Sequence, residues 1–163
     1  MSVIDSVAQA VYDTGWATGI RESEVVFPVI ETVHVMALAL IAGTIAVVDL
    51  RLLGLVLRDA PAGEVERRIV PITWVGFAIM ALSGGLLLAS EAVKIIHNPA
   101  FIAKFVAMGL AGVNVGLFHW LARPQVLAAP VGAPLPVSAR VAAVVSLSLW
   151  LVVIAAGRAI AYF

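Results

Sequence analysis

Glu31 and His34 are the two residues of this 163-residue chain whose types and spacing point most directly to chemistry. They stand three positions apart in an apolar stretch, so in a helix both side chains lie on one face. Carboxylate and imidazole groups bind zinc, iron and copper. Glu91 and His97 follow the next apolar stretch and extend this set. The sequence therefore predicts a transition metal site formed by Glu31, His34, Glu91 and His97.

Glu-x-x-His is also the spacing used by di-iron carboxylate bundles. Those sites need two copies of the motif and two further glutamates, whereas this chain has one copy. The ligand count therefore excludes a di-iron centre.

Axial ligation of haem b is a second role for His34. Met108 or His97 is the candidate sixth ligand, because Met108 stands about as deep in its apolar stretch as His34 does in its own. Lys104 and Arg158 are expected to pair with the haem propionates. Either cofactor would serve electron transfer or metal handling, and the pattern leaves open whether the protein is an enzyme.

A second group of polar residues marks the opposite ends of the same stretches: Asp49, Arg51, Asn114 and His119. We expect these side chains to form a structural polar clamp, in which Asp49 pairs with His119. The group holds one histidine, and a two-haem arrangement of the cytochrome b type needs a histidine pair at each end.

Four apolar stretches carry these residues, at positions 25–48, 69–90, 100–121 and 141–162. Each is long enough to cross about 30 Å of hydrocarbon as a helix. The whole chain is 63% hydrophobic and 12% charged, which leaves too few charged residues to cover a soluble domain. We therefore predict an all-α, integral membrane four-helix bundle, with residues 1–163 as a single transmembrane domain.

The first residues of the chain are amphipathic. Ile4, Val7, Ala8 and Val11 recur at helical spacing, with Asp5 and other polar residues between them. This pattern predicts a short N-terminal helix at the membrane interface.

Basic residues are concentrated in the first and third loops, which predicts that these loops are cytoplasmic and that both termini are on the outer side. The formal net charge is zero, so no nucleic-acid partner is expected. With no cysteine, the chain forms no disulfide and no thiolate metal site.

Glycines mark where helices approach closely in lipid. A stripe on the third stretch consists of Gly109, Gly112 and Gly116. We expect it to face the second stretch, which has glycines at positions 76, 84 and 85. A glycine-lined face of this kind is also where a neighbouring membrane subunit or a second copy of the chain would pack.

These segments resemble a bacterial family of small four-helix inner-membrane proteins of unknown function. The similar segments are FPVIETVHVMALALIAGTIAVVDLRLLGL, PITWVGFAIMALSGGLLL, HNPAFIAKFVAMGLAGVNVGLFH and SLWLVVIAAGRAIAYF. The family's polar pattern corresponds to Glu31, His34, Asp49, Arg51, Trp74, Asn98, Lys104, Asn114, His119 and Arg158. The resemblance implies a multi-pass protein of the bacterial inner membrane with a shared site, and it supplies no reaction. A looser likeness to copper-resistance D type proteins and b-type cytochromes rests on helix number and a buried histidine.

Two alternatives to a cofactor site stay open at this point. In the first, the protein is a non-catalytic accessory or scaffold subunit of a larger membrane complex, and its polar residues neutralise one another. In the second, the bundle carries out proton-coupled transport through Glu31 or Asp49. The bilayer itself is the remaining expected partner.

Overall fold

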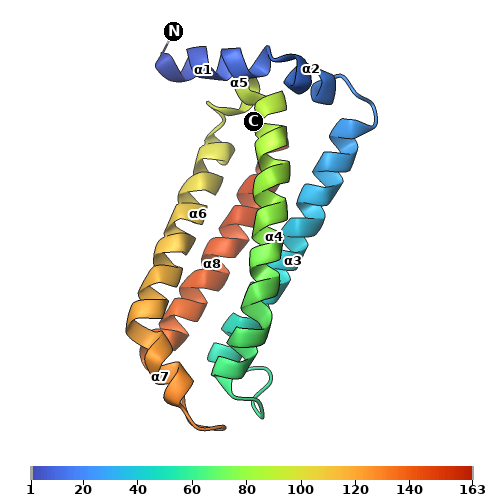
Figure 1. The fold of residues 1–163 in the computed structure, drawn as a ribbon. Coiled ribbons are helices and arrows are strands. Elements are labelled where there is room, and N and C mark those ends of the chain that lie inside the picture. The colour runs from blue at the N-terminus through green and yellow to red at the C-terminus, as the bar shows by residue number, and fades with distance from the viewer. Residues whose placement is uncertain (1, 163) are drawn as a thin grey trace.

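The computed structural model describes residues 2–162, and every regular element in this range is helical. Four long helices run along one another (Figure 1): α3 Val26–Leu52, α4 Ala62–Ser90, α6 Pro99–Leu117 and α8 Val137–Ala159. α6 continues through a π-helical turn, η1 (Phe118–Ala122), into α7 (Arg123–Ala128). All four are long and apolar enough to cross a membrane. The predicted all-α four-helix bundle is confirmed, and the protein is a multi-pass membrane protein.

The helices extend beyond the apolar stretches from which they were predicted. α4 begins seven residues before the expected span, because Pro61 precedes its first turn and the charged residues that follow favour helix. The third span runs through η1 to the end of α7. Apolar character therefore locates a span, whereas the helix ends depend on prolines and on helix-forming polar residues.

Three short helices lie at one end of the bundle: α1 Val3–Tyr12, α2 Gly15–Arg21 and α5 Ala92–Ile95. α1 lies across this end, which is also where α8 finishes (Figure 1). Ser2 and Asp5 form a capping box that starts α1. Val3, Ile4 and Val7 are exposed on α1, as an interfacial helix requires. The expected short N-terminal helix is thus present.

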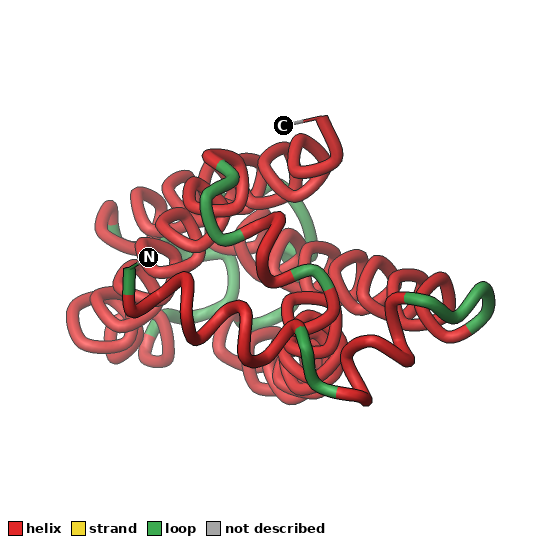
Figure 2. Tube along the Cα trace, turned by 90° about the horizontal axis from the view of Figure 1, so that it is seen from above, coloured by secondary structure: helices red, strands yellow, loops and turns green. Residues whose placement is uncertain are grey.

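The long helices pack as two pairs. α3 lies along α4, α6 lies along α8, and contacts between α3 and α8 join the pairs. Figure 2 views this arrangement from the end that carries α1. Over residues 2–162, α4 and α6 make no extended contact with each other. α3 and α8 are therefore the two helices through which the pairs join, with α4 packed on α3 and α6 packed on α8.

An apolar cluster joins the pairs near mid-bundle and includes Ile41, Met80, Ala107, Trp150 and Val153. The Trp150 ring packs edge-on against the Phe77 ring of α4, with 5.9 Å between centroids. Packing in this cluster accounts for a tryptophan in the middle of a span.

The predicted contact between the glycines of α4 and α6 is wrong. A methyl group at Gly76 would lie 2.9 Å from Ile41 Cγ1, so this glycine faces α3. Gly109, Gly112 and Gly116 are exposed on α6, and none has an atom within 4 Å of an added Cβ. α6 packs against α8 through its small alanines instead, because α4 is not its neighbour.

Candidate functional site

His34 lies half-buried on α3 and faces α4. Its Nδ1 is 3.0 Å from Ser83 Oγ, and the Ser83 hydroxyl also lies 2.7 Å from the Ile79 carbonyl oxygen. Gly84 is the next residue of α4, and a methyl group there would lie 2.9 Å from His34 Cε1. The absence of a side chain at Gly84 therefore lets the imidazole lie against the α4 backbone.

Lys104 is the half-buried cation of α6. Its aliphatic chain runs past Gly157 of α8, with Nζ 3.7 Å from an added Cβ. Within residues 2–162, Nζ has no ion-pair partner. His34 and Ser83 are in contact across α3 and α4, and Lys104 is the cation that α6 buries; we call these three residues the His34 centre.

Met108 is one helical turn beyond Lys104 on α6 and packs against the mid-bundle apolar cluster. It is partly buried. Met108 therefore lies on the inward face of α6, one helical turn from Lys104 of the His34 centre.

The other residues expected around His34 have separate partners. Glu91 pairs with Lys94 at 2.7 Å, and His97 Nε2 lies 2.7 Å from Asp5 Oδ1 of α1. The Arg158 guanidinium donates to the Tyr162 hydroxyl at 3.1 Å, and Glu31 is exposed. Over the described part of the chain, no three His, Asp or Glu side chains are grouped to hold a metal ion. The residues Glu31, His34, Glu91 and His97 therefore do not form one ligand set here.

The end of the bundle that carries α1 is held by two charge contacts outside the spans. The Ser2 backbone N–H, together with the side chains of His97 and Ser2, holds the pKa of Asp5 below its ordinary value of 3.8. The Glu91 carboxylate raises the pKa of Lys94 by accepting its hydrogen bond. The Asp5–His97 contact attaches α1 to the turn that follows α5 and holds His97 at this end of the bundle, whereas the Glu91–Lys94 pair is local to α5.

At the opposite end, Arg51 is buried and donates from Nε and Nη2 to the Ala60 carbonyl oxygen, at 3.0 and 2.7 Å. This contact closes the loop between α3 and α4. Asp49 is buried two residues earlier beside Ser146 of α8, and its Oδ2 has no hydrogen-bond partner in the described residues. Asn114 donates to the Ala142 carbonyl oxygen at 2.9 Å and so joins α6 to α8.

The expected pair of Asp49 with His119 is wrong. His119 Nδ1 lies 2.9 Å from the Val115 carbonyl oxygen, and its Nε2 lies 3.9 Å from Glu66 of α4. Glu66 is buried and accepts from Arg123 Nε at 2.6 Å, which joins α4 to α7. Sequence reasoning missed Glu66 because it precedes the apolar stretch, although it shares a helix face with buried Ala62.

Comparison with known proteins places these residues in a family. A family model described as a family of unknown function, DUF6644, matches residues 19–163. The chain belongs to this family. His34, Ser83 and Lys104 all lie inside the matched range, whereas α1 precedes it. No curated protein and no solved structure matches the chain.

Proposed function

We propose that this membrane protein binds haem b through His34 and serves in electron transfer. The observation that carries the proposal is the hydrogen bond between His34 Nδ1 and Ser83 Oγ. Haem supplies a one-electron couple at its iron when it is bound. The residues of this chain would hold and orient it.

The hydrogen bonds around Ser83 indicate which ring nitrogen of His34 is free to bind iron. A serine hydroxyl has one hydrogen, and Ser83 Oγ donates it to the Ile79 carbonyl oxygen. Ser83 Oγ therefore accepts from His34 Nδ1–H, and the lone pair is on Nε2. A histidine that binds a metal through one nitrogen normally donates the other N–H to an acceptor in this way.

The surrounding residues fit an anionic, iron-containing group. Gly84 fixes the plane of the imidazole by lying against it. Lys104 is a half-buried cation suited to a propionate carboxylate. Met108 would be the second residue to hold the iron in preference to His97, because His97 is bonded to Asp5 outside the spans.

The haem content of purified protein tests this assignment. Wild-type protein, expressed with haem supplied and purified in mild detergent, is expected to contain one haem per chain by pyridine haemochrome analysis. His34→Ala is expected to lose this haem while retaining a monodisperse, helical bundle. His119→Ala is the matched control, since it removes an exposed imidazole at the other end. Equal haem content in wild type and His34→Ala would exclude His34 as the ligand.

A second candidate function, an accessory subunit of a larger membrane assembly, is supported by the exposed stripe of Gly109, Gly112 and Gly116. Small residues in lipid allow close helix approach, and this stripe lies on the face of α6 away from α8. Gly112→Leu would fill that face without touching the bundle interior. If the stripe is an interface, this variant should migrate as a smaller species than wild type on native gels in mild detergent.

A further inference from the structure

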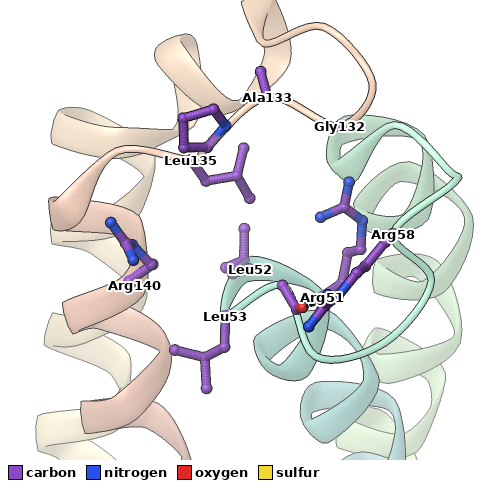
Figure 3. A pocket seen from close by; sticks show the side chains of 10 residues that line it. Arg51, Leu52, Leu53, Arg58, Gly132, Ala133, Leu135 and Arg140 are labelled. Atoms are coloured by element: carbon purple, nitrogen blue, oxygen red, sulfur yellow. Dashed lines mark hydrogen bonds between the residues drawn. The ribbon is translucent and has the colours of Figure 1, made fainter.

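A pocket of about 250 Å³ opens at the end of the bundle remote from α1 (Figure 3). It lies between the loop that joins α3 to α4 and the segment that leads into α8. Arg51 and Arg58 lie on one side of it and Arg140 on the other. The rest of its lining consists of Leu52, Leu53, Gly54, Gly132, Ala133, Pro134 and Leu135. We call it the three-arginine pocket.

The lining of this pocket carries positive charge and no carboxylate. In residues 2–162, none of the three arginines forms an ion pair. Arg51 is only 5% exposed, and its hydrogen bonds go to a neutral carbonyl oxygen. A buried guanidinium without a counter-ion is costly, so an anion in the pocket would be strongly favoured.

The chain holds two of the three arginines in place through its own backbone. Arg51 is tied to Ala60, and Arg58 Nε donates to the Gly54 carbonyl oxygen. Gly54 and Gly132 have φ values of 73° and 79°, which glycine adopts without strain, and each lies in a turn of a lining loop. The guanidinium groups of Arg51 and Arg58 are thus partly ordered before any ligand binds.

An apolar groove adjoins the pocket. It is a shallow, open groove of about 460 Å³ on α8, lined by Val137, Arg140, Val141, Val144 and Val145. Arg140 therefore lines both the charged pocket and the apolar groove. A ligand that occupies both has an anionic head and a hydrocarbon chain.

We propose that the three-arginine pocket binds the phosphate of an anionic phospholipid, whose acyl chain lies along the valine groove of α8. Guanidinium groups bind phosphate through paired hydrogen bonds. Basic pockets at the ends of membrane helices are suited to such head groups. The groove favours a lipid over free phosphate, because a soluble phosphate would use the arginines and leave the valines uncovered.

Native mass spectrometry of the purified full-length chain tests the proposal, with phosphatidylglycerol and phosphatidylcholine titrated into the detergent. We expect wild type to retain phosphatidylglycerol in preference to phosphatidylcholine. Each arginine near a head group contributes about fivefold, so Arg58→Gln with Arg140→Gln should weaken phosphatidylglycerol binding about 25-fold. Arg67→Gln removes an exposed charge near the same end and is the matched control, expected to leave binding unchanged.

The valine groove distinguishes a lipid from a soluble anion. Val141→Asn with Val144→Asn should weaken phosphatidylglycerol binding with all three arginines intact, and equimolar glycerol phosphate should not displace the lipid from wild type. Displacement by glycerol phosphate, or full binding to the valine variant, would contradict the lipid assignment. An equal loss in Arg67→Gln and the double arginine variant, or no loss in either, would overturn the site itself.

Discussion

His34 differs from the other two histidines of the chain in what its ring nitrogens contact. His97 is exposed and bonded to a carboxylate of α1, and His119 is exposed and bonded to a carbonyl oxygen of its own helix. His34 is half-buried between helices, and its Nδ1 lies 3.0 Å from the Oγ of Ser83, which is itself 2.7 Å from the Ile79 carbonyl oxygen. This chemical difference, rather than the motif Glu-x-x-His, identifies His34 as the candidate ligand.

Ser83→Ala tests the hydrogen bond between His34 Nδ1 and Ser83 Oγ by removing a single oxygen atom. The variant removes the acceptor of the Nδ1 hydrogen, so the imidazole loses its fixed orientation. Loss of such an outer partner lowers cofactor affinity about 10- to 100-fold. A haem titration of the apoprotein should show this decrease for Ser83→Ala, whereas Ser148→Ala, an exposed serine on α8, should bind as wild type does. Equal affinities for both variants would show that Ser83 does not position the ligand.

The pair of Asp5 with His97 makes α1 docking sensitive to acid. The pKa of Asp5 is lowered in the folded chain, so its contribution is present above the ordinary value of 3.8 and is lost as pH falls through the lowered pKa. His97→Ala should raise the pKa of Asp5 toward 3.8, with part of the shift retained because the bonds from Ser2 remain. Titration of the Asp5 carboxyl carbon by NMR measures this change. An unchanged pKa in His97→Ala would contradict the contact.

At the scale of the elements, α4 uses glycine to approach α3 closely. The Gly76 position leaves no room for a methyl group beside Ile41, which is fully buried. Gly85 is on the same helix, but an added methyl group there meets nothing within 4 Å. Substitution of Gly76 therefore tests packing against α3, whereas substitution of Gly85 tests the helix propensity of the residue alone.

We expect Gly76→Ala to lower the free energy of unfolding by about 1 to 3 kcal/mol through overpacking. Gly85→Ala should cause no loss and raise it by up to about 1 kcal/mol, because alanine favours helix over glycine. Reversible unfolding in mixed micelles, followed by circular dichroism, compares the two variants. A greater loss for Gly85→Ala than for Gly76→Ala would mean that α3 and α4 do not pack in this way.

The elements themselves could be predicted from the sequence, but their side-chain partners could not. Span length and hydropathy gave four helices, and antiparallel order placed His34 and Lys104 at similar depth. Neither property defines which helices are neighbours, so the glycines of α6 were assigned to the wrong partner. Depth alone also grouped Glu91 and His97 with His34, although local pairs with Lys94 and Asp5 hold them at the bundle end.

At the scale of the whole molecule, the two ends of the bundle differ in chemistry. One end carries α1, α2, α5 and the end of α8, and the other carries the three-arginine pocket (Figure 1). The excess of basic residues at the second end predicts that it is cytoplasmic. This orientation would place the His34 centre in the outer half of the membrane and the proposed lipid site in the inner leaflet.

Labelling of single cysteines tests the orientation directly, since the natural chain has none. Glu24 and Asp59 are exposed acidic residues at opposite ends of the bundle. A membrane-impermeant maleimide should label Glu24→Cys in intact cells and Asp59→Cys only after the membrane is permeabilised. The reverse pattern would place the termini in the cytoplasm.

The most direct test of the central claim is the dithionite-reduced minus oxidised absorption spectrum of the wild-type protein, purified in mild detergent after expression with haem supplied. Binding of haem b at the His34 centre predicts a b-type difference spectrum at one haem per chain, which His34→Ala abolishes. A folded, monodisperse protein with no absorption in the Soret region under these conditions would contradict it.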